Sequence, residues 1–389
     1  MQYRTLGNTG LKVSALGFGA MRLPMTADDK AVDRRLALPM FRRAFEGGVT
    51  YVDSAVGYCN EDSQRALGEA LADWFADGHP RDSIVVSTKN PHYNKADPDT
   101  WWKNLENSLE RLRVDYIDCY HHHFMSLKSF SEHVQGPGGH YEQMLKARDQ
   151  GLIRHIGFSW HDTPEHFIEV IDTGLFEFAT CQYNLLDRKN EPAIAHALAK
   201  GMGIIIMGPV AGGRLSVTAG PLGERLPTGI ATTPELALRF VLANPGVSVA
   251  LSGMTCMSDV DENLRTASRR EPLTDAEKKA TEEAMKALKG LADLYCTGCR
   301  YCEPKCPQQI RIADIFHHMI VRNVYGGEEA AVRGYAFMKK SAASAGKKMA
   351  DACIECGKCE KACPQNIPIR QQLKEARAAL GEAAATRAS

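Results

Sequence analysis

Residues 84–123, IVVSTKNPHYNKADPDTWWKNLENSLERLRVDYIDCYHHH, contain the alternation of elements that decides the fold. They begin with a short apolar, β-branched run at 84–88 and end with a second run at 116–123, and both runs predict buried strands. Between them, residues 98–111 follow an Asp-Pro start and are amphipathic, which predicts a helix. A strand and a helix followed by a new strand indicate a repeated βα unit.

The same alternation extends through the first 290 residues. Eight runs typical of strands lie at Ala15–Gly19, Val49–Asp53, Ile84–Thr88, Tyr116–His123, His155–Phe158, Ala179–Tyr183, Gly203–Met207 and Ser248–Ser252. Predicted helices lie at Asp29–Glu46, Ser63–Phe75, Pro98–Arg111, Tyr141–Asp149, Pro164–Asp172, Glu191–Lys200, Pro234–Ala243 and Asp259–Ser268. Eight strands that are each followed by a helix predict an α/β fold, the (β/α)8 TIM barrel. A doubly wound open sheet is the alternative, but no G-x-G-x-x-G follows the first strand, which disfavours a Rossmann fold.

Eight of the twelve cysteines form two copies of the motif C-x2-C-x2-C-x3-C-P near the C-terminus. Cysteines three residues apart can place three thiolates around one [4Fe–4S] cluster, and in the bacterial two-cluster arrangement the fourth cysteine binds the other cluster. We therefore predict two [4Fe–4S] clusters with exchanged fourth ligands. Their predicted ligands are Cys296, Cys299, Cys302 and Cys363 for the first cluster, and Cys353, Cys356, Cys359 and Cys306 for the second.

Two structural zinc sites or a disulfide knot are the alternatives for these cysteines. Zinc usually takes paired C-x2-C units from separate segments, and a disulfide framework is typical of small secreted chains. The cysteine-rich region resembles two-cluster bacterial-type ferredoxins, except that 46 residues separate Cys306 from Cys353. Residues 310–340 have helical periodicity that is interrupted at Gly326-Gly327. The region therefore looks like the helical ferredoxin modules that are fused to larger redox enzymes.

Polar residues at the carboxyl ends of the predicted strands are candidates for the site, because barrel chemistry is found at that end. They are Asp53, Tyr58, Lys89, His121, His122, His123, Ser159, Trp160, His161, Gln182, Asn184 and Ser252. The segments YRTLGNTGLKVSALGFGAMRL, VDSAVGY, STKN, DYIDCYHHH, GFSWH, CQYN and DENL resemble, in this order, the motifs of the aldo-keto reductase family. The resemblance covers residues 1–290, and the cysteine-rich end matches a subgroup with a fused ferredoxin-like module.

The resemblance implies that Asp53, Tyr58, Lys89 and His123 form a catalytic tetrad. A phenol with a pKa of about 10 is a poor proton donor at neutral pH, and a neighbouring ammonium lowers that pKa. In this interpretation Asp53 keeps Lys89 charged and placed, and Tyr58 donates a proton to a carbonyl oxygen while hydride reaches the carbonyl carbon. His123 orients the carbonyl. The alternative is a salt bridge at the barrel rim, with Tyr58 as packing.

The run of three histidines departs from the family pattern, which has apolar residues before the last one. Because side chains alternate along a strand, His121 and His123 are predicted to point into the barrel and His122 toward the helices. A metal site at the inward pair is an alternative. A role in substrate polarity or a satisfied hydrogen bond is the preferred interpretation.

The resemblance also implies a nicotinamide cofactor, NAD(P)H. It assigns to that cofactor Ser159, Gln182, Asn184, Gly208, Pro209, Gly212, Gly213, Arg214, Ser252, Glu262 and Asn263. The first three would hold the carboxamide, and the loop at 208–214 would wrap the pyrophosphate with backbone N–H donors. Cys256 stands where many relatives place an arginine for the 2′-phosphate of NADP, which weakens the case for NADP. NAD, no nicotinamide and a flavin all stay open as alternatives.

These features predict an oxidoreductase that interconverts a carbonyl and an alcohol in the barrel. Its clusters are predicted to exchange electrons with a ferredoxin-like or other redox partner protein. A hydride carries two electrons and each cluster passes one, and the sequence offers no account of how the two couple. Two alternatives stay open. One is an electron-transfer protein whose barrel is a degenerate binding scaffold, and the other is an ordinary NAD(P)H-dependent reductase with structural clusters.

Length and charge bound the remaining possibilities. The 389 residues are 44% hydrophobic, and 47 basic side chains balance 47 acidic ones, so binding to nucleic acid is not predicted. No apolar run approaches the roughly 18 residues of a membrane span. The N-terminus lacks the pattern of a signal peptide, which predicts a cytoplasmic protein. The predicted domains are the barrel at 1–285, the two-cluster domain at 286–375 and a flexible tail at 376–389.

Overall fold

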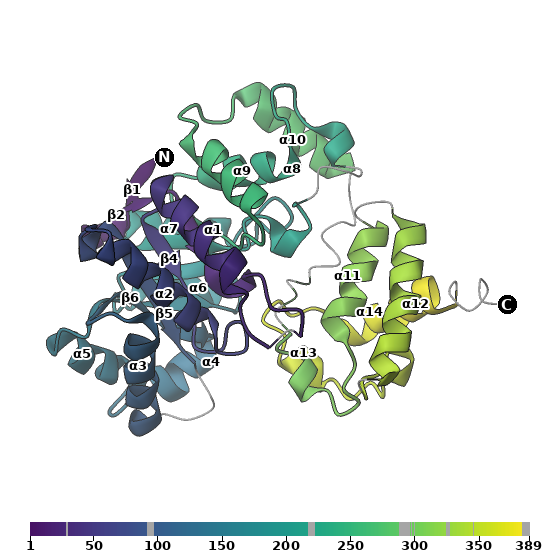
Figure 1. The fold of residues 1–389 in the computed structure, drawn as a ribbon, viewed down its shortest axis with the longest axis horizontal. Coiled ribbons are helices and arrows are strands. Elements are labelled where there is room, and N and C mark those ends of the chain that lie inside the picture. The colour runs from purple at the N-terminus through teal and green to yellow at the C-terminus, as the bar shows by residue number, and fades with distance from the viewer. Residues whose placement is uncertain are drawn as a thin grey trace. The chain divides into compact units, whose positions relative to one another are not determined.

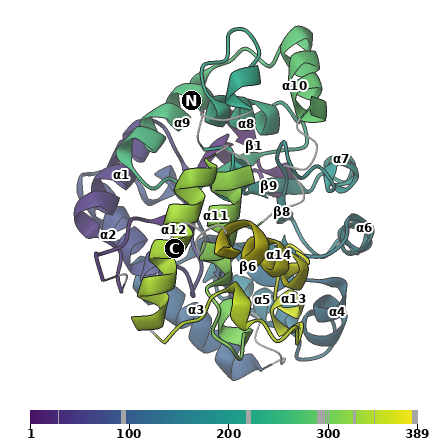
Figure 2. The ribbon, with the colours of Figure 1, turned by 90° about the vertical axis from the view of Figure 1, so that its right-hand side faces the viewer.

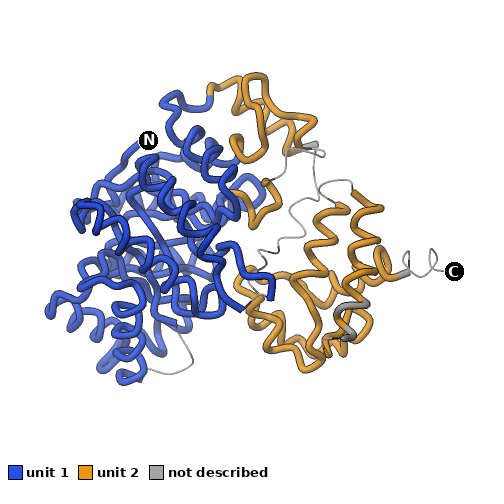
Figure 3. Tube along the Cα trace, viewed as in Figure 1, with its two compact units in different colours: residues 1–209, 237–273 blue, residues 210–236, 274–389 orange. Residues whose placement is uncertain are grey.

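The computed structural model describes residues 1–28, 30–91, 97–216, 222–287, 296, 298, 300–323, 327–344 and 346–382. The chain divides into two compact units, which Figure 3 distinguishes by colour. The first unit contains residues 1–209 and 237–273, and the second contains residues 210–236 and 274–389. The predicted cluster ligand Cys299 lies outside the described residues, as do residues 383–389 of the predicted tail.

Eight parallel strands close into a barrel in the first unit (Figure 1). In order around the barrel they are β10 (Val249–Ser252), β3 (Leu16–Gly19), β4 (Tyr51–Asp53), β5 (Val85–Asn90), β6 (Ile117–Met125), β7 (Ile153–Trp160), β8 (Phe178–Gln182) and β9 (Gly203–Met207). Each strand overlaps one of the eight predicted runs. The closed order confirms the (β/α)8 barrel and rules out the open doubly wound sheet.

Helices alternate with these strands along the chain, as predicted. They are α1 (Arg34–Glu46), α2 (Ser63–Ala76), α3 (Pro98–Leu112), α5 (His140–Asp149), α6 (Pro164–Asp172), α7 (Glu191–Ala199), α8 (Thr233–Leu242) and α9 (Met257–Ser268). The start of α1 differs from the prediction of Asp29, which itself lies outside the described residues. The helix begins at Arg34 because Asp33 is its N-cap, with a carboxylate that accepts a hydrogen bond from the N–H of Arg35 at 3.0 Å.

An antiparallel hairpin covers the amino ends of the barrel strands. Its strands are β1 (Tyr3–Thr5) and β2 (Lys12–Ser14). Leu6 and Val13 of this segment are fully buried in one apolar cluster with Tyr51, Val85, Cys119, Phe178, Ile205, Val249 and Leu251 of the barrel. Several of these barrel residues begin their strands. The hairpin therefore closes the amino end of the barrel with apolar packing, and polar side chains are concentrated at the opposite, carboxyl end.

Gly68 allows α2 and α3 to approach closely. A Cβ atom at this position would lie 2.1 Å from the carbonyl oxygen of Arg111, on the last turn of α3. We expect Gly68→Ala to lower the free energy of unfolding by about 1–3 kcal/mol, because backbone atoms must move apart. Urea unfolding measures the effect. Asp73→Ala on the exposed face of α2 is the control, and we expect it to change stability by less than about 0.5 kcal/mol.

The second unit contains a separate group of helices. Helices α11 (Ile312–Asn323) and α12 (Glu328–Ser344) lie side by side, and α14 (Ile369–Ala376) packs against α11 (Figure 2). The interruption between α11 and α12 falls at the predicted Gly326-Gly327, of which Gly326 lies outside the described residues. Residues 377–382 extend α14 with a helical turn in which Leu380 is fully buried. In the part of the chain that the structure describes, no helix is long and apolar enough to cross a membrane.

Candidate active site and cluster-binding motifs

Three neighbouring strands bring the predicted tetrad together at the carboxyl end of the barrel. Asp53 ends β4, Lys89 is the penultimate residue of β5, and His123 lies near the end of β6. The parallel register pairs Asp53 with Ser87 and Lys89 with His121, so β5 and β6 extend beyond the end of β4 and carry Lys89 and His123 past the level of Asp53. Tyr58 is in the turn that follows β4. The structure therefore gathers four residues that are spread over 70 positions of sequence.

Lys89 and Asp53 form an ion pair that is almost completely buried, with side chains 3% and 4% exposed. The ammonium also donates to the carbonyl oxygen of Ser54 at 2.9 Å, and the Ser87 hydroxyl donates to the second oxygen of Asp53 at 2.8 Å. Burial raises the pKa of Asp53 and lowers the pKa of Lys89, while each ion opposes the shift of the other. The carboxylate is thus held from both sides, and it holds the ammonium in place.

Tyr58 lies beside this pair and is half-buried. The ammonium nitrogen of Lys89 is 5.0 Å from the centre of its ring, and the ring of His123 meets it edge-on with centres 5.9 Å apart. An ammonium at this distance stabilises a phenolate relative to a phenol. The arrangement can therefore hold a phenol, a cation and an imidazole around one reacting group.

An irregularity in β6 surrounds His123. The pairing of β6 with β7 shifts register between His122 and Met125, and Phe124 has a left-handed φ of 65°. The backbone N–H of Phe124 donates to the Ser159 hydroxyl at 2.8 Å, which holds the irregularity in place. Burial, followed by the charge of Lys89, keeps the pKa of His123 well below its usual range. The imidazole is therefore neutral at neutral pH and can donate or accept a hydrogen bond.

The two other histidines of β6 take the directions that alternation predicts. His121 is buried inside the barrel, where its Nε2 lies 2.9 Å from the Thr180 hydroxyl and its ring packs edge-on against Phe178. His122 is buried on the other side, and its Nδ1 lies 3.2 Å from Nδ1 of His140, the first residue of α5. The structure thus gives His121 the satisfied hydrogen bond that was preferred over a metal site.

Several of the residues assigned to nicotinamide come together at the ends of β7, β8 and β9. The amide nitrogen of Asn184 donates to the carbonyl oxygen of Gly208 at 2.9 Å. Gly208 has a φ of 65°, and a Cβ atom there would lie 2.5 Å from the side-chain oxygen of Gln182. The side chain of Ser159 lies 3.4 Å from Nε2 of His161. Gln182 and Asn184 therefore both lie against Gly208, whereas Ser159 lies against His161 and the backbone of Phe124.

The remaining assigned residues occupy two further places. The amide of Asn263 on α9 donates to the hydroxyl of Ser252 at the end of β10, at 2.9 Å, and Glu262 on the same helix is half-buried. Pro209 is buried. Gly212 and Gly213 have left-handed φ values of 66° and 98°, and Arg214 is buried. These three residues belong to the second unit, whereas Gly208 and Pro209 belong to the first.

The described cysteines of the two motifs line two separate cavities in the second unit. One is lined by Cys306 together with Cys353, Cys356 and Cys359, and the other by Cys296, Cys302 and Cys363. Isoleucines, Leu373 and Phe316 supply apolar walls. The last cysteine of each motif therefore lies with the other motif, as predicted for exchanged fourth ligands. In the described residues, no group of three or more Cys, His, Asp or Glu side chains could hold a single metal ion.

The two motifs have the same backbone conformation at equivalent positions. Left-handed φ values occur at Gly298 and Glu355, at Arg300 and Gly357, and at Gln309 and Asn366. Each pair is 57 residues apart. Such residues turn successive backbone N–H groups toward one side, which suits an anionic cluster. The donor set, the two cavities and this loop geometry all fit a pair of [4Fe–4S] clusters.

A glutamate after the third cysteine of each motif links the loop to a helix. Glu303 accepts from the N–H of Ala313 on α11 at 3.0 Å, and Glu360 accepts from the N–H of Arg370 on α14 at 2.9 Å. These two residues and Ser87 are not among the site residues that the sequence predicts. The repeat C-E-x-x-C-P-Q-x-I-x-I could have indicated the glutamates. Strand alternation places Ser87 on the same face as Lys89 and could have indicated it.

Comparison with known proteins gives the class of this chain. The model of the Aldo/keto reductase family matches residues 15–286, and the model of the 4Fe-4S dicluster domain matches residues 295–368. The first match covers well over half of the chain. The chain therefore belongs to the aldo-keto reductase family, is an oxidoreductase, and carries a C-terminal 4Fe–4S dicluster domain.

Individual relatives agree with this class. L-galactose dehydrogenase of Arabidopsis thaliana is 29% identical over 300 residues, which are 70% of this chain and 90% of the relative. NADH-specific methylglyoxal reductase of Escherichia coli is 26% identical over 335 residues, which are 73% and 98% of the two chains. The solved holo form of an aldo-keto reductase from Bacillus halodurans is similar with a TM-score of 0.61 and 26% identity, over 73% of this chain and 96% of that one.

Proposed function

We propose that the barrel interconverts a carbonyl and an alcohol, with Tyr58 as the proton donor. The observation that carries this proposal is the buried Lys89–Asp53 pair beside the Tyr58 ring. A buried ion pair is costly to desolvate, and its place at the carboxyl ends of the strands favours a catalytic role over a structural one.

The proposed roles follow from the contacts. Asp53 and the carbonyl of Ser54 hold the Lys89 ammonium, which stabilises the phenolate that remains when Tyr58 gives its proton to the carbonyl oxygen. The neutral imidazole of His123 donates a hydrogen bond that orients the same oxygen. Nicotinamide, when bound, supplies the hydride that reaches the carbonyl carbon. One hydride and one proton together convert the carbonyl to the alcohol, and alcohol oxidation is the reverse.

For the cofactor, we propose NADH rather than NADPH. Ser159, Gln182 and Asn184 would hold the carboxamide end. The N-cap of α9 is Cys256, whose thiol is exposed, and it offers no cationic partner to a 2′-phosphate. The printed name of the Escherichia coli relative, an NADH-specific reductase, points the same way.

For the second unit, we propose two [4Fe–4S] clusters in the two cysteine-lined cavities, within a domain that starts after residue 285. When bound, they transfer single electrons to or from a redox partner protein. Cys299 completes the first ligand set in this proposal. The cysteines hold the iron, and the apolar walls exclude water from the clusters.

Tyr58→Phe tests the proposed reaction. Removing the phenolic proton is expected to lower kcat for carbonyl reduction by about 10²- to 10⁴-fold, while the visible absorption of the clusters is unchanged. The assay is NADH oxidation with methylglyoxal or another small aldehyde, in protein purified without oxygen. Unchanged turnover in Tyr58→Phe would show that the barrel does not use this residue as its proton donor.

A further inference from the structure

The loop that carries Tyr58 has an unfavourable backbone conformation. Cys59, Asn60 and Glu61 follow it directly, with φ values of 50°, 55° and 66°. Left-handed conformations are unfavourable for most residues other than glycine and asparagine, and here Cys59 and Glu61 both adopt them. Such a segment keeps its shape only where surrounding contacts hold it. Those contacts therefore also decide where the ring of Tyr58 lies.

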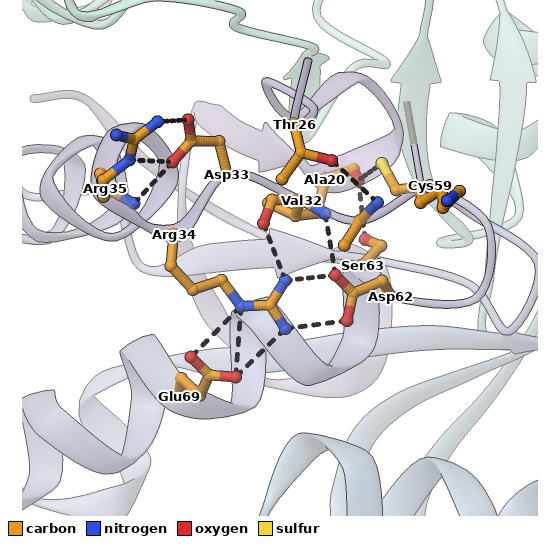
Figure 4. A network of polar contacts seen from close by, with 12 residues as sticks. Ala20, Thr26, Val32, Asp33, Arg34, Arg35, Cys59, Asp62, Ser63 and Glu69 are labelled. Atoms are coloured by element: carbon orange, nitrogen blue, oxygen red, sulfur yellow. Dashed lines mark hydrogen bonds and ion pairs between the residues drawn. The ribbon is translucent and has the colours of Figure 1, made fainter. Parts of the chain in front are cut away.

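Arg34, the first residue of α1, makes several of these contacts (Figure 4). Its two terminal nitrogens bind the two carboxylate oxygens of Asp62, one of them at 2.8 Å. The same guanidinium contacts both oxygens of Glu69 on α2 at 3.1 and 3.2 Å, and donates to the carbonyl oxygen of Val32 at 3.2 Å. Asp62 accepts in addition from the N–H of Val32 at 2.8 Å. One side chain thus joins the start of α1, the middle of α2 and the end of the Tyr58 loop.

This ion-pair group is largely shielded from water. The side chains of Arg34, Asp62 and Glu69 are 26%, 16% and 29% exposed. Burial alone would raise the pKa of Asp62, but the hydrogen bonds from Arg34 and from the backbone of Val32 keep it below its ordinary value. A two-point guanidinium–carboxylate pair also fixes direction, which a single-point contact does not. The pair can therefore hold a strained loop.

Weaker contacts hold the same loop from other sides. Arg111 on α3 donates to Glu61 at 3.0 Å, where Glu61 is largely exposed. The Ser63 hydroxyl donates to the carbonyl oxygen of Ala20 at 2.7 Å, and the Cys59 thiol lies 3.5 Å from the carbonyl oxygen of Met21. The contact between Arg34 and Asp62 joins two charges at two points, whereas Arg111 contacts Glu61 at one.

We propose that Arg34, acting through Asp62, is a positioning residue that holds the Tyr58 ring against the Lys89 ammonium. The proposal rests on the proposed function of Tyr58 as proton donor. Arg34 contacts the loop at Asp62, four residues beyond Tyr58, and its role is to limit the positions that the loop adopts. A displacement of about 1 Å at a reacting group can cost about 10²-fold in rate.

Arg34→Met removes the contact, and Arg42→Met is the matched control. Arg42 lies on the same helix and also binds two carboxylates, those of Glu46 and Asp77, but none in the Tyr58 loop. With NADH and methylglyoxal, we expect kcat of Arg34→Met to fall about 10- to 100-fold with little change in KM, and kcat of Arg42→Met to stay at the wild-type value. Asp62→Asn should resemble Arg34→Met, and the double variant should be no slower than either.

A second measurement does not depend on turnover. Ultraviolet titration of tyrosine ionisation, taken as the difference between each protein and its Tyr58→Phe counterpart, isolates one phenol among the 12 tyrosines. We expect the pKa of Tyr58 to rise in Arg34→Met and to stay unchanged in Arg42→Met, because a released ring moves away from the ammonium.

Three results would each overturn the proposal. They are a wild-type kcat in Arg34→Met, an equal loss of kcat in Arg34→Met and Arg42→Met, and an unchanged pKa of Tyr58 in Arg34→Met. Multiplied losses in the double variant would show that Arg34 and Asp62 do not act as one unit, and would also overturn it. Full turnover in Tyr58→Phe would instead refute the proposed function, and the titration would still report whether Arg34 positions the ring.

Discussion

Lys89→Met is expected to lower kcat for carbonyl reduction by about 10²- to 10⁴-fold and to destabilise the barrel by about 3–5 kcal/mol. Both effects come from one ion pair. The ammonium that stabilises the Tyr58 phenolate is lost, and the Asp53 side chain, which is 4% exposed, stays buried without its cation. The assays are NADH-dependent turnover and urea unfolding.

The double variant Asp53→Asn/Lys89→Met separates the two effects. Removal of both charges is expected to restore most of the stability, because no uncompensated ion is left in the barrel, but none of the activity. Stability that stays as low in the double variant as in Lys89→Met would contradict the ion-pair explanation.

Arg81→Met is the matched control for the loss of a barrel ion pair. Arg81 binds Asp118 at 2.9 Å, and the Asp118 side chain is 3% exposed. This pair lies at the amino ends of β5 and β6, away from the proposed site. We expect Arg81→Met to lose stability and keep its kcat. A comparable loss of kcat in Arg81→Met would mean that barrel stability, and not the chemistry of Lys89, limits turnover.

Cys306→Ser is expected to remove or convert one cluster, and to lower the iron content from about eight toward about four atoms per chain. The affected cluster should be the one assigned to Cys353, Cys356 and Cys359, since these residues line one cavity with Cys306. Because cluster binding contributes directly to the folding of such domains, the second unit should also become more sensitive to protease.

Two neighbouring variants decide which cluster is affected. Cys359→Ser should give the same electron paramagnetic resonance spectrum of the remaining cluster as Cys306→Ser. Cys302→Ser, only four residues before Cys306 in the chain, should give the other spectrum. If Cys306→Ser matches Cys302→Ser instead, each motif binds its own cluster and the exchanged ligation is wrong.

The eight strands could be predicted because each depends on a local pattern. Short β-branched runs alternate with amphipathic stretches, and this periodicity survives in a single sequence. The start of α1 is harder to predict. Aspartate is a common N-cap residue, and both Asp29 and Asp33 are candidates, so only the hydrogen bond of Asp33 shows where the helix begins. The strand ends and the resemblance to a family indicate the four tetrad residues one by one.

The barrel, the two cysteine motifs and the types of residue at the strand ends can therefore be predicted from the sequence, because spacing and periodicity encode them locally. The contacts between distant residues depend on the tertiary structure. It brings Ser87 to Asp53 and Arg34 to Asp62, and it places the register shift of β6 next to His123. It also placed Cys306 with the other motif, across 47 positions of chain from Cys353. These contacts join residues that are distant in sequence. A local sequence pattern does not indicate which distant residues will pack against each other.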